Sequence, residues 1–421
     1  MMSEQHKSAD LIVCGAGAAG MMAAITAAER GNSVLLVEKN DRPCRKVYIT
    51  GKGRCNLTND TTWQECLQNV VTGSKFLYSA MQAFPPQDVM AFFEDLGCPV
   101  KVERGGRVFP TSDKSASVID ALRNRSRNLP IRLVQATAES ILVKDGKVVG
   151  VRTNRDDYTA PAVVLAVGGA TYPRTGSTGD GYAMAQKVGH NIVSPTPSLV
   201  PLVEKGHLCR RMEGLALRNI ALKLVDAKGK TVFTDFGEAE FTEDGLTGPT
   251  VLSASCHMGR DDGFFVVIDL KPALSMEKLE ARLLRDLQKY QNSTMQSALV
   301  ELLPKRMILP ILNLAEIPAV IPAHSLRKEQ RQALLQVMKN LTIPILEKAP
   351  MEEGIVTSGG VSTREVDPKT MESKLVKGLY FAGELLDLDA YTGGFNLQIA
   401  WATGRCAGLS SAKQVRKDET L

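Results

Sequence analysis

The pattern of apolar positions near the N-terminus predicts alternating strands and helices. Residues 11–14 (LIVC) form an unbroken apolar run, which is typical of a buried parallel strand. Small and apolar residues over 18–30 indicate a helix that ends at Gly31, and residues 34–37 indicate a second strand that closes at Glu38. Strand, turn, helix and strand thus follow one another within about thirty residues.

Further along, the periodicity changes several times. Residues 163–167 form another apolar strand, which ends at Gly168 and Gly169 before a glycine-rich loop and a helix. The other expected elements of the first half are helices over 73–83 and 87–97, a loop over 103–125 that leads into a helix, and a β-meander over 131–154 with KDGK as its hairpin turn.

The middle of the chain has a different character. Short alternating runs over 195–273 indicate a β-rich domain, in which LTGP forms a turn and Pro249 takes the first position of a helix. Residues 275–345 show helical periodicity, and glycine-rich α/β sequence returns from about residue 354, with a strand over 379–382 and a helix from Leu397.

These elements predict an α/β protein with a Rossmann-like domain in two parts, interrupted by β-rich and helical insertions. The expected boundaries are 1–194 and 351–421 for the two parts, 195–273 for the β-rich domain and 274–350 for the helical subdomain. The apolar run 11–28 could instead be read as a signal peptide or a membrane span. Asp10, three glycines and the strand that follows argue against that reading.

The first turn carries the motif GxGxxG at Gly15, Gly17 and Gly20. In a dinucleotide site the first glycine permits the tight turn, the second allows close approach to a pyrophosphate, and the third allows the helix to pack on the strand. The helix N-terminus attracts the phosphates. Glu38 stands where an acid would accept hydrogen bonds from both hydroxyls of an adenosine ribose.

Composition adds little to this picture. The 421 residues carry a net charge of +5 with a pI near 8.7, which permits an anionic partner without requiring one. The eight cysteines form no CxxC pair or Cys/His ligand spacing, so a metal site is not expected. Scattered cysteines fit a reducing cytoplasm, and the four internal histidines beyond residue 189 are read as structural.

The last strand and helix favour FAD over NAD. In two-part FAD folds this unit closes the site: an acid near the strand end binds a ribityl or pyrophosphate hydroxyl, and the helix amides face the pyrimidine end of the isoalloxazine. Glu384 and Asp387 follow the strand here, and Gly393, Gly394, Phe395 and Asn396 precede the helix. A second GxGxxG for a dedicated NAD domain is absent, so NADH or NADPH is expected to bind transiently.

The stretch TGKGRCNLTN (50–59) combines glycines with cations, a thiol and an amide. Because it follows the second strand, it should lie along the cofactor. Gly51 and Gly53 would allow backbone contact, and Lys46, Lys52 and Arg54 would supply charge. These cations could also serve only to neutralise the pyrophosphate.

Together, several of these segments resemble one family: the BaiN/RdsA-type NAD(P)/FAD-dependent oxidoreductases, or HI0933-like flavoproteins. The matching text is GAGAAG, TGKGRCNLTN, AVGGATYPRTGSTGDGY, GLTGP, TSGGVSTREVDPKTMESK and GLYFAGELLDLDAYTGGFNLQIAWATG, and it spans nearly the whole chain. Cys44 and Lys52 depart from it, since many members have glycine or a small residue there.

The resemblance implies a discontinuous FAD domain interrupted by a β-barrel-like domain and a helical domain. It also implies reduction of a conjugated C=C bond. Two substrates are implied: a uridine of large-subunit ribosomal RNA, which becomes dihydrouridine, or a steroid enone such as a 3-oxo-Δ4 bile-acid intermediate.

Reduction of uracil requires a proton at C5 after hydride reaches C6. Cys55 is the candidate general acid, because a thiol of ordinary pKa is protonated at neutral pH. The alternative is that Cys55 is a small buried residue that packs on the flavin. Arg104, Arg107, Arg123, Arg125 and Arg127 could meet RNA phosphates, although a solvated helix face also explains them.

The expected site residues fall into two groups. The candidate catalytic residues are Cys55, Lys52 and Arg54. The expected cofactor-binding residues are Gly15, Gly17, Ala18, Ala19, Gly20, Glu38, Lys39, Arg45, Lys46, Gly51, Gly53, Arg54, Val134, Val167, Gly168, Gly169, Gly383, Glu384, Asp387, Gly393, Gly394, Phe395, Asn396 and Leu397.

Three functions remain open from the sequence. The first is an FAD-dependent reductase of uridine in ribosomal RNA, the second a small-molecule ene-reductase, and the third a non-catalytic RNA-binding factor that carries flavin. We expect a cytoplasmic protein with ribosomal RNA or a small enone as its partner, no membrane association and no metal.

Overall fold

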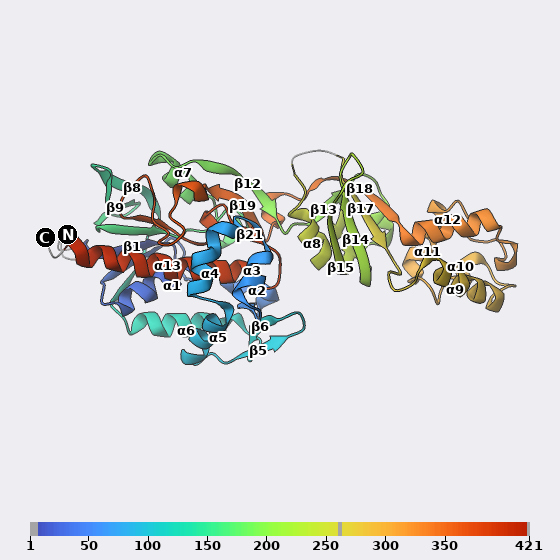
Figure 1. Ribbon diagram of the computed structural model, residues 1–421, viewed down its shortest axis with the longest axis horizontal. Coiled ribbons are helices and arrows are strands. Elements are labelled where there is room, and N and C mark those ends of the chain that lie inside the picture. Colours follow the sequence, from blue (N-terminus) through green and yellow to red (C-terminus); the bar gives the residue numbers. More distant parts are fainter. Residues whose placement is uncertain (1–6, 260–262, 419–421) are drawn as a thin grey trace. The chain divides into compact units, whose positions relative to one another are not determined.

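The computed structural model describes residues 7–259 and 263–418 and divides into two compact units (Figure 1). The first unit combines the chain up to Ser198 with the chain from Met351 onward, and the second is Leu199–Pro350. The predicted α/β fold, with a Rossmann-like domain in two parts, is confirmed.

A five-stranded parallel sheet lies at the centre of the first unit. Its order is β20-β11-β1-β2-β7, so the first strand of the chain is central and the last strand of the sheet is an edge. The strands are β20 (Leu379–Phe381), β11 (Ala162–Leu165), β1 (Leu11–Cys14), β2 (Val34–Glu38) and β7 (Ile131–Gln135). Every residue of β1, β2, β11 and β20 is buried, which explains their unbroken apolar runs.

Helices and small sheets surround this sheet. The helices are α1 (Ala18–Glu29), α2 (Arg45–Gly53), α3 (Trp63–Gln68), α4 (Tyr78–Ala83), α5 (Pro86–Asp95), α6 (Ser115–Arg127), α7 (Asp180–Lys187) and α13 (Phe395–Asp418). The small sheets are β10-β9-β8 (Asp157–Thr159, Lys147–Thr153, Ala138–Lys144), β3-β6-β5 (Thr58–Asn59, Arg107–Pro110, Val100–Glu103), β12-β19 (Ile192–Ser198, Val356–Val361) and β21-β4 (Asp389–Ala390, Val70–Thr72).

Glycines bring the first and last helices into close contact. A Cβ on Gly404 of α13 would stand 2.3 Å from the carbonyl oxygen of Ala19, and one on Gly408 would stand 2.5 Å from that of Ala23. Only residues without a side chain allow α13 to approach α1 so closely. The C-terminal helix is thereby held against the helix that follows the glycine motif.

Two sequence expectations in this unit were wrong. Residues 131–135 do not open a meander; as β7 they pair in parallel with β2, placing Val134 beside Val37. Residues 107–110 form β6 instead of a loop. Partners distant in the sequence decide both assignments. Helix α2, which begins at Arg45, was not predicted; its geometry stops being helical at Thr50, where the stretch 50–59 begins.

The second unit contains a closed six-stranded barrel, as the family resemblance implied. Its strands follow the order β13 (Leu202–Glu204), β16 (Gly245–Thr247), β15 (Thr231–Phe241), β14 (Ala216–Val225), β17 (Phe265–Asp269) and β18 (Leu341–Lys348). Helix α8 (Pro249–Ser255) begins at Pro249, and five of its seven residues are buried. It packs on β15, β14, β16 and β13.

Helices α9 (Met276–Lys289), α10 (Met295–Ala298), α11 (Lys305–Leu314) and α12 (Lys328–Lys339) complete this unit. The helical expectation for 275–345 was wrong at its end, because residues from Leu341 onward form β18 and close the barrel. One hydrophobic core includes residues of both the barrel and the helices. The division of this unit into a β-rich and a helical domain stays a prediction.

The apolar run 11–28 folds as β1 and α1. No helix in the described ranges is long and apolar enough to cross a membrane.

A buried histidine joins two segments of the first unit. His190 Nε2 lies 2.7 Å from Ser373 Oγ, and its Nδ1 lies 3.3 Å from Glu365 Oε2. Ser373 Oγ already accepts hydrogen bonds from the N–H groups of Leu375 and Val376. Its own hydrogen therefore points to Nε2, which assigns the single ring proton to Nδ1, facing Glu365. A second ring proton, on Nε2, would have no acceptor, because Ser373 Oγ already accepts two hydrogen bonds.

This arrangement predicts a pH-dependent stability. Burial lowers the pKa of His190, while Glu365 acts in the opposite direction. Because the unfolded chain takes up the proton more readily, the stabilisation is present above about pH 6.5 and is lost as the pH falls below it. We expect His190→Gln to flatten the fall in unfolding free energy between pH 8 and pH 5, measured in urea. The exposed His207, changed to Gln, serves as the control, and parallel curves for wild type and His190→Gln would refute the assignment.

Candidate functional site

The three glycines between β1 and α1 have different surroundings. Gly15 has a φ of +94°, and a Cβ there would lie 2.5 Å from the carbonyl oxygen of Ala166. A Cβ on Gly20 would lie 1.7 Å from the carbonyl oxygen of Gly15. Apart from its immediate chain neighbours, no heavy atom of the described residues lies within 4 Å of the same position on Gly17. Two of the glycines therefore permit backbone packing, and Gly17 leaves open space at the helix N-terminus.

The N-terminus of α1 offers its amides to that space. Gly17 is the N-cap residue, no side chain caps the helix, and the first turn holds no acidic residue. The first amides of a helix have no partner within it, and its dipole places partial positive charge there. Ala18 and Ala19 in this turn add no bulk, so the end of α1 can receive an anionic group.

Glu38 lies beside this turn at the end of β2. It is 8% exposed, and its carboxylate accepts hydrogen bonds from the N–H of Ala16 at 2.8 Å and the N–H of Asn40 at 2.9 Å. The side-chain amide of Asn40 donates to it as well. The acid is thus oriented by backbone amides next to the glycine turn.

The neighbouring cations are engaged with the protein. Lys39 Nζ lies 2.6 Å from Asp180 Oδ2 and donates to Thr178 Oγ1, while Arg45 donates to Asn40 Oδ1 at 3.0 Å. Lys39 and Arg45 therefore border the Glu38 end of the site and help to connect it to the segment that begins α7.

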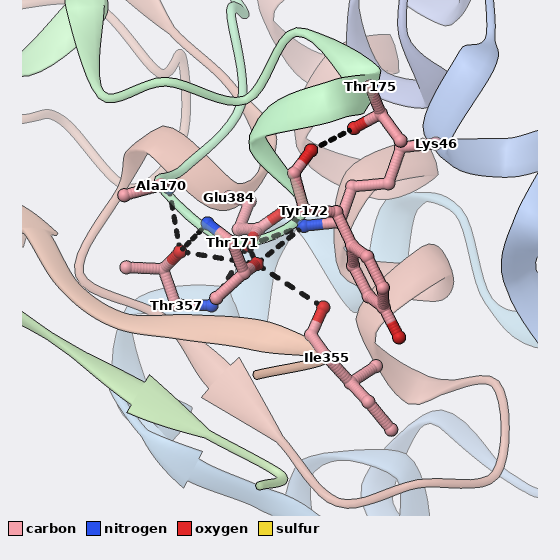
Figure 2. Close-up of polar contacts among 8 residues, drawn as sticks. All are labelled: Lys46, Ala170, Thr171, Tyr172, Thr175, Ile355, Thr357 and Glu384. Atoms are coloured by element: carbon pink, nitrogen blue, oxygen red, sulfur yellow. Dashed lines mark hydrogen bonds and ion pairs between the residues drawn. The ribbon is translucent and has the colours of Figure 1, made fainter. Parts of the chain in front are cut away.

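The best connected part of the site is centred on Lys46 and Glu384 (Figure 2). Lys46 Nζ donates to both oxygens of Glu384, at 2.6 and 2.9 Å, and to Thr171 Oγ1 at 2.8 Å. Thr171 Oγ1 also lies 3.1 Å from Glu384 Oε1. The ammonium sits 5.8 Å from the ring centroid of Tyr172, whose φ is +53°. Residues 338 positions apart in the sequence form one ion pair, so most of the charge of Lys46 is balanced within the protein.

Thr357 completes this cluster by ordering the loop after β11. Its N–H donates to Glu384 Oε1 at 2.9 Å, and its hydroxyl oxygen accepts from the N–H of Ala170 and of Thr171. A Cβ on Gly169 would lie 2.4 Å from that hydroxyl oxygen. Gly168 has a φ of +80°, so both glycines are needed for this turn.

Sequence reasoning missed Thr171, Tyr172 and Thr357. The signal for Thr171 was its place directly after a strand that ends in two glycines, at the carboxyl edge of the sheet where ligands bind in such folds. Thr357 had no comparable signal, because β19 precedes the last strand and its pairing with the loop after β11 is a long-range contact.

The stretch 50–56 has an unusual backbone. Gly51, Lys52, Gly53 and Cys55 all have positive φ, at +57°, +57°, +84° and +60°. Cys44, directly before α2, also has a positive φ of +62°. Left-handed geometry favours glycine, which is a physical reason to expect glycine at positions 44 and 52 in relatives; that Cys44 and Lys52 depart from the family pattern stays a prediction.

Arg54 holds this loop to the neighbouring strands. Its guanidinium donates to Asp113 and to Glu103, and it lies 4.0 Å from the ring centroid of Phe109. The hydrogen bond from Arg54 lowers the pKa of Glu103, so the pair is fully charged at neutral pH. These contacts engage Arg54 with the protein's own side chains, and its expected role in catalysis or cofactor binding stays a prediction.

Protein atoms cover Cys55 completely, with 0% of its surface exposed. Burial raises the pKa of the thiol to about 12, so it is protonated at neutral pH. A proton donor must also contact the substrate, and this thiol packs within the main hydrophobic core. The burial favours the packing alternative, and the acid role stays a prediction. Lys52, in contrast, is exposed.

The residues that follow bind the start of α13. Asn59 Nδ2 donates to the carbonyl of Gly393 at 3.1 Å, Thr58 Oγ1 donates to Gln398 at 2.7 Å, and the indole of Trp401 donates to the carbonyl of Leu57. A Cβ on Gly394 would lie 2.3 Å from the carbonyl oxygen of Thr58. The GRCN loop and the GGFN turn, which both stood out in the sequence, are therefore neighbours in the fold.

The remaining expected residues lie around this junction. Asn396 exchanges hydrogen bonds with Ala390 through its side-chain amide, Phe395 is buried and Leu397 is half-buried. Asp387 is half-buried, and burial followed by the charge of Asp389 raises its pKa. Gly383 has a φ of +72°, and its Cβ position is 2.8 Å from Ala19 Cβ. Val167 lies beside Gly15.

These residues fit an extended dinucleotide such as FAD. The open space at Gly17 lies beside an uncapped helix N-terminus, which suits a pyrophosphate. Glu38 suits a ribose. Asn56 Oδ1 is buried and has no hydrogen-bond partner among the described residues, and an isoalloxazine offers an N–H donor for such an acceptor. Within the same residues, no group of three or more His, Cys, Asp or Glu side chains could hold a metal ion.

Comparison with known proteins gives consistent results. Residues 9–410 match the family described as "HI0933-like protein Rossmann domain". The chain is 32% identical over 411 residues to the 3-dehydro-bile acid delta(4,6)-reductase of Clostridium scindens, covering 96% of this chain and 98% of the relative. It is 30% identical over 397 residues to the ribosomal RNA dihydrouridine synthase of Escherichia coli, covering 94% and 96%.

Solved structures share the fold. The 3-ketosteroid-delta4-(5alpha)-dehydrogenase of Rhodococcus jostii aligns with a TM-score of 0.51 at 17% identity, covering 98% of this chain and 99% of that one. A quinol-fumarate reductase aligns with a TM-score of 0.53 at 21% identity, covering 98% and 72%. The glycine turn, the two-part domain and these matches agree: the chain is an oxidoreductase that belongs to the HI0933-like family with its Rossmann domain.

Proposed function

We propose that this protein is an FAD-dependent reductase that converts a uridine of large-subunit ribosomal RNA to dihydrouridine. The observation that carries the reductase chemistry is the match of nearly the whole chain to two enzymes whose names describe reduction at a conjugated C=C bond. Uridine is favoured because ribosomal RNA dihydrouridine synthases of two organisms match over at least 94% of the chain, and because the net charge of +5 suits an anionic polymer.

FAD would bind along the first unit. The amides at Gly17, Ala18 and Ala19 would hold its pyrophosphate, and Glu38 would accept from its adenosine ribose. The Lys46–Glu384 pair orders the loops after β11 and β20, and Glu384 would hold the ribityl chain of the bound cofactor. The GRCN loop and the start of α13, bound to each other through Asn59 and Thr58, would enclose the isoalloxazine.

The reaction adds two hydrogens across C5 and C6 of uracil. Bound FAD, reduced by NADH or NADPH, would supply a hydride to C6, the carbon conjugated to the C4 carbonyl. The resulting enolate needs a proton at C5. Around this reaction, the buried Asn56 amide would orient the ring system, and the Arg54 clamp would keep the left-handed loop in place.

The burial of Cys55 gives a direct test of its role. We expect Cys55→Ser to keep its FAD and at least a tenth of wild-type turnover, because the thiol is covered by the protein's own atoms. The turnover of the variant is measured with RNA as substrate, and its FAD content is measured by absorbance. A loss of more than a hundredfold with normal FAD content would instead assign Cys55 as the general acid.

A small-molecule ene-reductase is the second candidate. The bile acid reductase of Clostridium scindens is slightly more similar to the chain than the Escherichia coli enzyme, at 32% against 30% identity. Such an enzyme would reduce an enone by the same hydride and proton additions. The non-catalytic alternative gains no support, because these relatives are all named as enzymes.

Purified holoenzyme can separate the two substrates. It would be supplied with NADPH or NADH and either protein-free large-subunit ribosomal RNA or a 3-oxo-Δ4 steroid acid. We expect dihydrouridine in the digested RNA, measured by mass spectrometry, and oxidation of the nicotinamide in equal amount. Reduction of the steroid alone would replace the proposal with the second candidate.

A further inference from the structure

An exposed tyrosine and several exposed cations lie on neighbouring segments of the first unit. Tyr48 on α2 is 59% exposed, and Ile49 beside it is 39% exposed. Lys52, in the left-handed loop, is exposed, as are Arg104, Arg107 and Lys114. We call the surface formed by these six residues the Tyr48 face.

Contacts connect the segments that carry this face. Ser115 Oγ donates to the carbonyl of Tyr48 at 2.8 Å, which brings Lys114 next to α2. A Cβ on Gly51 would lie 3.2 Å from the ring of Phe109, and the guanidinium of Arg107 lies 5.9 Å from the centroid of the same ring. The end of α2 therefore meets β6 at Phe109 and meets the turn before α6 at Tyr48.

The charges of this face are not balanced by the protein. Arg54 and Lys101, which lie in the same region, are paired with Glu103 and Asp113. No carboxylate within the described ranges pairs with Lys52, Arg104, Arg107 or Lys114. An acid that lies close to this region is Asp60, whose N–H donates to the carbonyl of Gly106. Four cations without an acidic partner in these ranges give this face a positive charge.

Two arginines of α6 that could also have met RNA phosphates do not share this property. Arg125 on α6 lies 2.7 Å from Glu29, and Arg123 lies 3.5 Å from Asp120. These two side chains are paired with acids, so they offer less charge to a polyanion than the Tyr48 face does.

We propose that the Tyr48 face binds single-stranded RNA next to the reacting uridine, an inference that rests on the proposed function. Tyr48 stacks on a base, and the four cations contact phosphates. Cations spread over three chain segments match a polymer of phosphates better than the single carboxylate of a steroid acid. Lys52 belongs to the same loop as Asn56, so bound RNA would approach the candidate cofactor site. A target base must leave its stack to react, and an exposed aromatic ring supports a neighbouring base when it does.

RNA binding by this face can be tested with the holoenzyme and a single-stranded oligouridylate of about fifteen nucleotides. Fluorescence anisotropy measures the affinity at salt concentrations from about 50 to 200 mM. We expect Tyr48→Leu to weaken binding about tenfold and Tyr48→Phe to bind like wild type, because stacking needs only the ring. Arg104→Gln/Arg107→Gln/Lys114→Gln should reduce the slope of log affinity against log salt by about 2, at roughly 0.7 per phosphate contact. Arg152→Gln, which removes a cation paired with Asp157, serves as the matched control.

The outcomes distinguish a failure of the RNA-binding assignment from a failure of the proposed function. Equal affinity and equal salt slope for wild type, Tyr48→Leu and the triple variant would overturn the assignment of the face. Formation of dihydrouridine in ribosomal RNA by the same preparations is measured in parallel. If wild type forms dihydrouridine while the binding data are unchanged by the variants, the face is refuted and the proposed function stands. If wild type forms none, the proposed function fails, and the anisotropy data still decide whether the face binds RNA.

Discussion

Gly17→Ala should fold normally and lose its FAD, with affinity reduced at least a hundredfold. Apart from its immediate chain neighbours, no heavy atom of the described residues lies within 4 Å of the Cβ position on Gly17, so the methyl group has room. It would enter the space beside the amides of α1, where the pyrophosphate is proposed to lie. An N-cap change between glycine and alanine alters helix stability by less than about 1 kcal/mol. Titration of FAD into the FAD-free protein measures the affinity, and the melting temperature of the variant measures its stability.

Two further glycine variants make this result specific. Apart from its chain neighbours, Gly259 likewise has no heavy atom of residues 7–259 and 263–418 within 4 Å of its Cβ position, and Gly259→Ala should keep both stability and FAD. Gly20→Ala should fail to fold stably, because its Cβ would stand 1.7 Å from the carbonyl oxygen of Gly15. Normal FAD affinity in Gly17→Ala would show that the glycine turn does not hold the cofactor.

Lys46→Met and Glu384→Gln should each destabilise the protein by about 2–3 kcal/mol and release FAD, because each change breaks the Lys46–Glu384 pair. Removing one partner of a fully buried pair costs about 3–5 kcal/mol, and these side chains remain 22% and 18% exposed, which reduces that cost. The double variant should be less destabilised than the sum of the single variants, since no charge is left without a partner. Urea unfolding of all four proteins gives the coupling energy.

A more exposed pair provides the control for this cycle. Lys39 and Asp180 are 26% and 43% exposed, and the cycle of Lys39→Met with Asp180→Asn should give a coupling below about 1 kcal/mol. Additive effects of Lys46→Met and Glu384→Gln would mean that the two residues act separately. In that case Lys46 would be free to neutralise the pyrophosphate, as the sequence first suggested.

The sequence predicted the parts of the site that are local. The strand, glycine turn, helix and acid from Leu11 to Glu38 lie within one stretch. Its hydrophobic pattern and its glycine motif both predict the same unit. The turn at Pro249 and the glycine-rich return after residue 354 were also visible. Cys44 and Lys52 could be noted as unusual, although their positive φ angles were not visible in the sequence.

Long-range pairing set the limit of prediction. β7 was predicted as the first strand of a meander with the two strands that follow it along the chain, and only its register with β2, about a hundred residues earlier, makes it an edge of the parallel sheet. The ion pair of Lys46 with Glu384 and the contacts of Thr58 and Asn59 with α13 join positions more than 300 residues apart. No local pattern encodes such contacts. Lys46 and Glu384 had each been expected near the cofactor, but not as partners of one another.

The dihydrouridine content of large-subunit ribosomal RNA tests the central claim most directly. It would be measured by mass spectrometry of digested nucleosides from cells with the gene, without it, and with it restored as wild type or as Gly17→Ala. The proposed function predicts loss of one dihydrouridine site on deletion, return with the wild-type gene, and no return with Gly17→Ala. An unchanged dihydrouridine content after deletion would contradict the claim and direct attention to enones as substrates.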